Sequence, residues 1–226
     1  MGARGAEPGV FLPTRHRRRT IRLVQRGRSP GSGRGPRVIA GELGGLRLVT
    51  PRGATTRPTT DRVKESVFGA LGSARLAGAR VLDGYAGSGA LAIEALSRGA
   101  AEAVLIDRDP RAVDAIRRNL ASTKLVDRAR VQRRGLGGFL QGHPPANPFD
   151  LVFLDPPYDL NGQELARILE LLAQPAWTTS EVGVVIERSG AAGPPSLPPG
   201  WQVAWERVYG DTLVVLVGPD ADAPSA

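Results

Sequence analysis

The sequence predicts a doubly wound α/β domain whose sheet is mostly parallel. Three short apolar segments end in aspartate, at Val81–Asp83, Ala103–Asp107 and Phe149–Asp155, and such runs are typical of buried parallel strands. Each is followed by a turn and then by apolar residues at helical spacing. This alternation predicts a ligand at the carboxyl ends of the strands, where the three aspartates would meet. With 226 residues, 41% of them hydrophobic, the chain is long enough for one such domain.

Further elements continue the alternation. Asp109-Pro110 is typical of a helix start, with Asp as the N-cap and Pro at the first helical position. The turn Tyr209-Gly210-Asp211 separates the last two predicted strands and predicts that they pair antiparallel. The remaining predicted strands are Arg130–Arg134, Val182–Glu187, Val203–Val208 and Leu213–Val217.

The composition excludes several kinds of site. The chain has no cysteine, so it can form neither a disulfide nor a site with cysteine ligands. Its two histidines, His16 and His143, are too few for a histidine-based metal site. No apolar run approaches the length of a membrane span, and no segment resembles a secretory signal. We therefore expect a cytoplasmic protein that needs no metal and binds no membrane.

The net charge of +8 is confined to the start of the chain. Residues 1–36 contain nine Arg and one Glu, whereas residues 37–226 contain 21 basic and 21 acidic side chains. A segment so rich in Arg, Gly and Pro cannot bury a core, so we expect residues 1–36 to be a disordered Arg-rich tail. Residues 219–226 are expected to be disordered as well. The tail either adds salt-dependent affinity for phosphates or is a dispensable extension, and its Gly and Pro residues disfavour a targeting helix.

A rigid turn, Asp155-Pro156-Pro157-Tyr158, follows the third apolar segment. The prolines end the strand and fix the Asp155 carboxylate, the Pro156 carbonyl and the Tyr158 ring in one turn. The tetrapeptide resembles the catalytic signature of S-adenosylmethionine-dependent methyltransferases that modify exocyclic amines. Two oxygen acceptors can direct the amine lone pair at an electrophilic methyl, and the ring can support an unstacked base. The alternative is a strand that ends in a proline-rich turn with a solvated Asp.

A glycine-containing turn, Asp83-Gly84-Tyr85-Ala86-Gly87-Ser88-Gly89, follows the first strand. Its glycines permit close approach of the backbone to a ligand, as in dinucleotide-binding loops. Two details disfavour a dinucleotide: Ala92 replaces the third glycine of that fingerprint, and Asp83 would repel a pyrophosphate but suit a cationic amino acid. Asp107, at the end of the next strand, can accept the ribose hydroxyls of an adenosine. The expected cofactor contacts are Asp83, Tyr85, Ala86, Gly87, Ser88, Gly89 and Asp107.

Residues 37–64 carry six basic and two acidic side chains, and residues 108–134 carry nine and three. Each basic patch either contacts an RNA backbone or is a solvated face. Alternation around Gly44-Gly45 predicts a β-hairpin over Arg37–Thr50, either a ribbon that grips RNA or an ordinary edge hairpin. Thr60 is the predicted N-cap of the next helix, whose positive end can bind a cofactor carboxylate or a substrate phosphate. The alternative is a simple capped helix. The candidate RNA contacts are Arg37, Arg47, Arg57, Arg62 and Lys64, and Thr60 is a further candidate cofactor contact.

Three motifs occur in the order found in a known bacterial family. Arg57–Ser66, Asp83–Gly89 with Glu94–Ala100, and Asp155–Tyr158 together resemble the RsmD family, whose members methylate the N2 amine of one guanine in small-subunit ribosomal RNA. The resemblance runs from about Arg37 to Gly218. It implies a class I S-adenosylmethionine-dependent methyltransferase fold, Rossmann-like with a reversed terminal strand, over residues 57–218, after a hairpin extension over residues 37–56.

The resemblance also implies the partners and the roles of individual residues. S-Adenosylmethionine is the expected methyl donor, and 16S ribosomal RNA of the assembled or assembling small (30S) subunit is the expected substrate. Asp155, Pro156, Pro157 and Tyr158 match the catalytic turn of the family. We expect the chain to act as a monomer.

Two positions depart from the related sequences. Many members of the wider superfamily carry Asp or Asn where this chain has Gly135-Leu136, so adenine contacts are expected from the backbone at Gly135 or from Arg108 and Arg134. The family commonly has Leu or Phe where Gly84 stands, and we expect this glycine to loosen the turn.

Three other functions share these features. Adenine-N6 DNA methyltransferases and glutamine-N5 protein methyltransferases have the same fold and a similar tetrapeptide, but they favour Asn at the position of Asp155. The Arg57–Ser66 segment argues against both. The third is a non-enzymatic ribosome-assembly module that binds RNA, and the intact acidic and glycine positions argue against it.

Overall fold

The computed structural model describes residues 35–51, 60–157 and 159–220. All of them belong to the second of two units into which the chain divides, Arg34–Ala226. The predicted disordered segments lie outside the described residues, except for residues 35, 36, 219 and 220. Two predicted site residues, Arg57 and Tyr158, also lie outside them.

Among the described residues, seven strands form one sheet in the order β3-β2-β1-β4-β5-β7-β6. The strands are β1 Arg80–Asp83, β2 Glu102–Asp107, β3 Ala129–Arg133, β4 Phe149–Leu154, β5 Thr178–Ser189, β6 Trp201–Tyr209 and β7 Thr212–Pro219. The first five pair in parallel, whereas β7 is antiparallel to both β5 and β6. This arrangement confirms the predicted doubly wound, mostly parallel sheet, in which the last strand of the chain is reversed.

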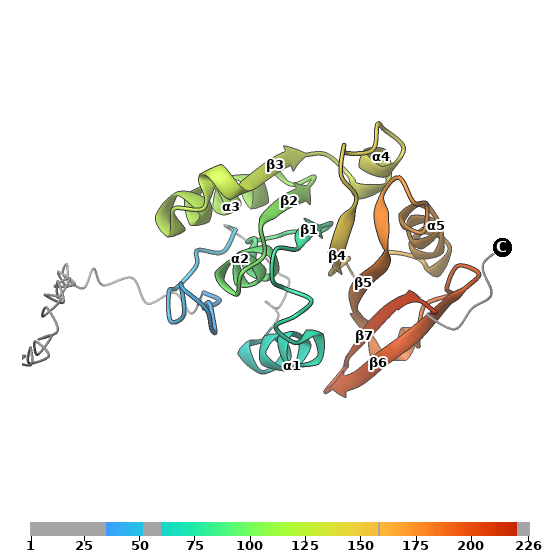
Figure 1. Cartoon of the computed structure of the whole chain (residues 1–226). Helices are drawn as coiled ribbons and strands as arrows, with labels where there is room; N and C mark the ends of the chain where they lie inside the picture. The colour runs from blue at the N-terminus through green and yellow to red at the C-terminus, as the bar shows by residue number, and fades with distance from the viewer. Residues whose placement is uncertain (1–34, 52–59, 158, 221–226) are drawn as a thin grey trace, which may run out of the picture. The chain divides into compact units, whose positions relative to one another are not determined.

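Helices cover both faces of the sheet (Figure 1). They are α1 Asp61–Leu71, α2 Ala90–Ser97, α3 Pro110–Thr123, α4 Leu136–Leu140 and α5 Gly162–Leu172, with 3-10 turns at Val126–Arg128 and Gly190–Ala192. One core packs α1, α2 and α3 on the sheet through Phe68, Ile93 and Ile116, and a second core packs α4 and α5 through Phe139 and Leu169. No helix in these described parts of the chain is long and apolar enough to cross a membrane.

Side-chain caps begin three of these helices. The Thr60 hydroxyl accepts a hydrogen bond from the backbone N–H of Val63 at 3.3 Å, at the start of α1. Asp109 caps α3 in the same way and is followed by a proline, and Asn161 caps α5. The predicted caps Thr60 and Asp109 are therefore confirmed. Each satisfies a backbone donor that the first turn of a helix leaves unpaired.

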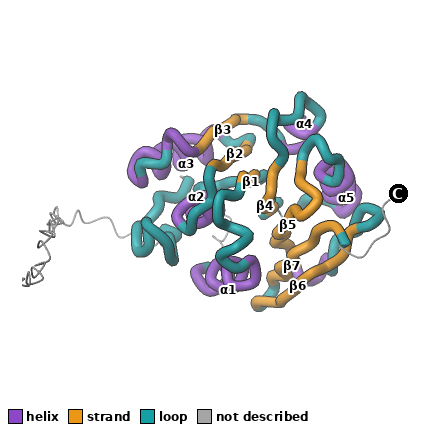
Figure 2. The backbone as a smooth tube through the Cα atoms, viewed as in Figure 1, coloured by secondary structure: helices purple, strands orange, loops and turns teal. Residues whose placement is uncertain are grey.

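Segment 35–51 is less regular than predicted. Arg37 and Arg47 form a single antiparallel bridge, and the segment is drawn as loop in Figure 2. Its backbone is also held by a buried carboxylate of α2. Glu94 accepts hydrogen bonds from the N–H groups of Ile39 at 2.6 Å and Ala40 at 3.0 Å. Backbone hydrogen bonds also join the two sides of the segment, from the N–H of Val38 to the carbonyl of Leu46 at 2.9 Å, and from the N–H of Leu48 to the carbonyl of Pro36 at 2.8 Å. The predicted hairpin is therefore present in a short form; the division of the chain at residues 37–56 stays a prediction.

Lys64 does not have the surface position that an RNA contact requires. Its side chain is buried, and its ammonium donates to the backbone carbonyl of Arg37 and lies 3.6 Å from the Asp61 carboxylate. Burial lowers the pKa of Lys64, and the charges of Glu94 and Asp61 oppose that shift. The prediction of Lys64 as an RNA contact is therefore wrong. Arg37 remains partly exposed and pairs with Asp61 at 3.0 Å.

Replacing the buried carboxylate of α2 should loosen segment 35–51. Glu94→Ala leaves the two backbone donors of Ile39 and Ala40 without their acceptor, and it removes the partner of Arg98, whose Nε lies 2.7 Å from the carboxylate. We expect the free energy of unfolding in urea to fall by about 2–4 kcal/mol.

Amide hydrogen exchange locates the effect. Exchange at the amides of Ile39 and Ala40 should accelerate in Glu94→Ala. Glu65→Ala, at an exposed position of α1, should change neither these exchange rates nor the free energy of unfolding. Unchanged protection of these two amides in Glu94→Ala would contradict this account of how the segment is held.

Candidate active site

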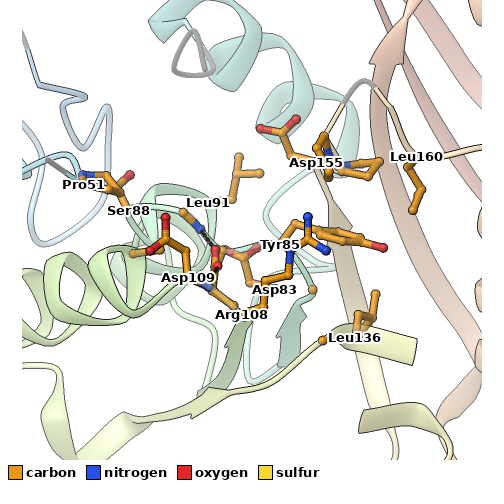
Figure 3. Close-up of a pocket in the computed structure, with 18 of the residues that line it drawn as sticks. Pro51, Asp83, Tyr85, Ser88, Leu91, Arg108, Asp109, Leu136, Asp155 and Leu160 are labelled. Carbon is orange, nitrogen blue, oxygen red and sulfur yellow. Dashed lines mark hydrogen bonds between the residues drawn. The ribbon is translucent and has the colours of Figure 1, made fainter. Parts of the chain in front are cut away.

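A cleft lies at the carboxyl ends of the parallel strands. It encloses about 610 Å³, within the range of pockets that bind small molecules. In the view of Figure 3, Pro51 and Ser88 lie on one side of the cleft, Asp155 and Leu160 on the other, and Asp83 between them. The predicted position of the ligand site at this edge of the sheet agrees with the cleft.

Among the carboxylates that line the cleft, four come from adjacent strands. Asp107 ends β2, Asp83 ends β1, Asp155 follows β4, and Glu187 lies on β5. The residues just before them, Ile106, Leu82, Leu154 and Ile186, all pack in the core beneath α4 and α5. Because side chains alternate along a strand, all four carboxylates point toward the opposite face, which α1, α2 and α3 cover.

Asp107 holds the glycine turn in place. Its carboxylate accepts hydrogen bonds from the N–H of Gly87 and from the N–H of Asp109, each at 2.8 Å. Gly87 and Gly89 have φ angles of 55° and 78°, the left-handed region that favours glycine. A Cβ on Gly89 would also lie 3.1 Å from the Leu105 side chain. The turn therefore requires both glycines, and the Asp107 oxygens keep lone pairs for further donors.

Asp83 is a buried carboxyl at the floor of the cleft. It is 2% exposed and accepts a hydrogen bond at 3.3 Å from the N–H of Ala92 in the first turn of α2. Burial raises the pKa of Asp83 to about 7; the Ala92 hydrogen bond opposes this shift and the charge of Asp107 adds to it. A cation bound beside Asp83 would favour its ionised form.

The part of the cleft next to α4 combines an aromatic ring with backbone groups. Tyr85, Gly135 and Leu136 line it, together with Arg108. Burial raises the pKa of Tyr85 to about 12, so its phenol is neutral at physiological pH. Such a surface can hold a flat heterocycle, with apolar contacts to its faces and backbone polar groups at its edge.

Gly84 has a packing role rather than the loosening effect that we expected. Its N–H donates to the carbonyl of Phe153 at 2.9 Å, which anchors the turn to β4. A Cβ at this position would lie 2.7 Å from a methyl carbon of Leu136 and 2.8 Å from one of Leu154. The expectation was therefore wrong, because the missing side chain makes room for two leucines.

The proline turn forms the wall of the cleft after β4. Asp155, Pro156 and Pro157 all line it, and the N–H of Leu160 donates to the carbonyl of Pro157 at 2.9 Å to close the turn. In Figure 3 the Asp155 side chain extends from the end of β4 toward the side that carries Leu91. The structure thus brings the described residues of this motif into the same cleft as the glycine turn.

A buried amide connects the glycine turn to segment 35–51. Asn119 of α3 is 1% exposed and donates to the Ser88 carbonyl at 2.8 Å and to the Val49 carbonyl at 2.9 Å. Its side-chain oxygen accepts from the N–H of Val49 at 2.8 Å. The next two residues of the segment, Thr50 and Pro51, line the cleft, so Asn119 positions this wall against the turn.

The predicted cofactor contacts mostly lie together. The lining includes Asp83, Tyr85, Ala86, Gly87, Ser88, Asp107, Arg108 and Gly135, and Gly89 is the N-cap residue of α2 next to them. Thr60 is absent from the described lining, and Arg47 and Arg62 are exposed away from it. Contacts of these three residues with cofactor or RNA stay predictions. Within residues 35–51, 60–157 and 159–220, no group of three or more acidic or histidine side chains could hold a metal ion.

Sequence reasoning missed Glu187 and Asn119. Glu187 is the last residue of a strand that the sequence pattern predicted. A carboxylate at the end of a predicted strand is the signal that identified the three aspartates, so the sequence could have identified Glu187 as well. Asn119 stands inside an amphipathic helix, where an Asn gives no indication of its partners. Its contacts depend on where segment 35–51 lies.

Comparison with known proteins places the chain among methyltransferases. The Escherichia coli protein named ribosomal RNA small subunit methyltransferase D is 36% identical over 189 residues, which cover 84% of this chain and 92% of that protein. The solved structure of the Escherichia coli protein yhhF is 34% identical, with a TM-score of 0.73, and the match covers 83% of this chain and 99% of that one. A ribosomal protein L11 methylase from Lactobacillus delbrueckii, 15% identical with a TM-score of 0.56 and covering 75% of this chain and 83% of that one, shares the fold alone.

A protein-family model covers the same region. The family described as conserved hypothetical protein 95 matches residues 36–218, which include the glycine turn, the proline turn and every strand of the sheet except the last residue of β7. The resemblance found in the three motifs is confirmed over most of the chain. The chain therefore belongs to the RsmD family, the family of ribosomal RNA small subunit methyltransferase D.

Proposed function

We propose that the protein transfers a methyl group from S-adenosylmethionine to the exocyclic N2 amine of one guanine in 16S ribosomal RNA. The observation that carries this proposal is that Asp155, Pro156 and Pro157 line the same cleft as the Gly87–Gly89 turn. A site for the donor and a site that can orient an amine are thus adjacent. The name of the Escherichia coli relative supports ribosomal RNA of the small subunit as the substrate.

The residues of the cleft fit S-adenosylmethionine. Asp107 has free lone pairs for the two ribose hydroxyls, while Asp83 matches the cationic amino-acid end. Tyr85 and Leu136 can contact the adenine ring, with the backbone at Gly135 at its edge. When bound, the donor supplies an electrophilic methyl, which the amine nitrogen takes as the sulfur–carbon bond breaks and S-adenosylhomocysteine is left.

Asp155 and Pro156 act on the amine. The lone pair of an exocyclic amine is delocalised into the base, which makes the nitrogen a weak nucleophile. The Asp155 carboxylate and the Pro156 carbonyl each accept one amine hydrogen and so turn the lone pair toward the methyl. The carboxylate also stabilises the positive charge that develops on the nitrogen and accepts its proton, directly or through water. The role proposed for the Tyr158 ring, support of the unstacked base, remains a prediction.

The substrate context is proposed on the same grounds. A target within the assembled or assembling small subunit, in the bacterial cytoplasm, agrees with the substrate implied by the family resemblance. The monomeric state stays a prediction. Asp rather than Asn at the first position of the proline turn favours guanine-N2 over the adenine-N6 and glutamine-N5 reactions.

The substrate proposal is tested by methyl transfer from labelled S-adenosylmethionine to three acceptors in parallel: small ribosomal subunits, stripped ribosomal RNA and duplex DNA. Nucleoside analysis of the products should detect N2-methylguanosine on subunits. Label in N6-methyladenine or in protein would contradict the proposed substrate but agree with the proposed methyl donor. Bound donor with no label in any acceptor would favour a non-enzymatic assembly module.

Asp155 should be needed for transfer but not for donor binding. We expect Asp155→Ala to lower the rate of transfer about 100-fold or more, because one of two amine acceptors is lost. Calorimetry should find the affinity for S-adenosylmethionine unchanged. Asp127→Ala, at an exposed carboxylate outside the cleft, is the matched control and should transfer at the normal rate. Loss of donor binding in Asp155→Ala would mean that its role is misassigned.

The pKa of Asp83 predicts a pH-dependent affinity for the donor. The carboxyl is about half protonated near pH 7 and must lose its proton when a cation binds, so binding weakens as the pH falls below about 7. Between about pH 6 and 8 the affinity should rise about tenfold from this group.

Asp83→Asn isolates that contribution, because the amino group of the donor titrates equally in both proteins. The variant should bind more weakly at pH 8 and should lack the part of the pH dependence assigned to Asp83. Calorimetric titrations at matched pH values measure both effects. Parallel pH profiles in the two proteins would contradict the assignment.

A further inference from the structure

The carboxylate of Glu187, on β5, has no part in the chemistry proposed so far. It lines the cleft together with Asp155 and Pro156. It also belongs to the row of four carboxylates on adjacent strands, in the order Asp107, Asp83, Asp155, Glu187. The first three are assigned to the ribose, the amino-acid end of the donor and the acceptor amine. Glu187 occupies the next place in that order, on the far side of Asp155 from the donor.

The register of the sheet sets Glu187 beside the amine-binding residue. Leu154 of β4 pairs with Ile186 of β5 in parallel, so the residues that follow them, Asp155 and Glu187, are neighbours across the two strands. Neighbouring strands lie about 4.8 Å apart. Both side chains point to the face that α1 covers, because Leu154 and Ile186 pack on the opposite face. A base whose amine is bound at Asp155 therefore presents a ring nitrogen next to that amine toward Glu187.

That ring nitrogen differs between the purines. In guanine two ring nitrogens flank the carbon that bears the amine: N1 carries a hydrogen and is a donor, whereas N3 is an acceptor, so a carboxylate beside the amine can pair only with N1. In adenine, and in 2-aminopurine, N1 is an acceptor. An ionised carboxylate can only accept hydrogen bonds, so it pairs with the first and repels the lone pair of the others.

We propose that Glu187 accepts the N1–H of the target guanine and thereby selects guanine over bases in which N1 is an acceptor. This inference rests on the proposed function, since it assigns the base that the same site recognises. A site built to pair with a substrate N–H rejects analogues that lack it much more strongly than a site that only matches shape.

2-Aminopurine separates recognition of N1 from the chemistry at the amine. It keeps the amine on C2 and lacks the N1 hydrogen. Small subunits are reconstituted with RNA that carries guanine or 2-aminopurine at the nucleotide that the wild-type protein methylates, and kcat/KM is measured for each. The wild-type protein should prefer guanine by about 100-fold. In Glu187→Gln, activity on guanine should fall about 10- to 100-fold while activity on 2-aminopurine holds or rises, because the Gln amide can donate to N1.

The matched control is Glu181→Gln, the same substitution on the same strand at its opposite end, where the side chain is exposed and outside the cleft. It should leave both rates unchanged. Calorimetry should find the same affinity for S-adenosylmethionine in Glu187→Gln as in the wild-type protein.

Three results would overturn the inference. Equal losses on guanine and 2-aminopurine would show that Glu187 acts without reading N1. Unchanged rates on both bases would show that it has no part in recognition or transfer, and weakened donor binding would assign it to the donor. Failure of the wild-type protein to form N2-methylguanosine is a separate result, which would reject the proposed function itself.

Discussion

The site depends on the parallel pairing of β1 with β2 on one side and β4 on the other. Asp83 pairs with Leu105 of β2 and with Phe153 of β4, so the carboxyl ends of three strands meet at one edge. Asp107 comes two residues after Leu105, and Asp155 comes two residues after Phe153. Since side chains repeat every two residues along a strand, all three aspartates point to the same face. A shift of one residue in either pairing would point one of these carboxylates into the hydrophobic core on the opposite face of the sheet.

Polar side chains then connect the loops to this frame. The half-buried Asp107 and the buried Glu94 and Asn119 each accept hydrogen bonds from backbone N–H groups of a loop. Buried backbone donors must be paired, so such side chains determine where the loops lie. The same concentration of carboxylates makes the cleft suited to a cation, as the raised pKa of Asp83 indicates.

Motifs that act through local structure were predictable. The proline turn ends a strand because proline lacks a donor, and Gly87 and Gly89 adopt left-handed angles that few other residues tolerate. Residues whose role depends on distant partners were not predictable. Lys64 is one of several basic residues in its segment of the sequence. Its burial became evident only from the structure, in which its ammonium donates to the backbone carbonyl of Arg37. Gly84 was expected to loosen a turn, yet its role follows from two leucines far along the chain.

The sequence by itself determined the α/β class, the reversed last strand, the two turns and the three strand-end aspartates, because periodicity and turn chemistry are local properties. Only the tertiary structure decided which strands are neighbours, and therefore the order of the carboxylates across the cleft. That order places Glu187 next to Asp155, although 32 positions separate them in the chain. The tertiary structure also fastens the short hairpin of segment 35–51 through Glu94 and Asn119, whose side chains accept from backbone donors that the pairing of its two sides does not use.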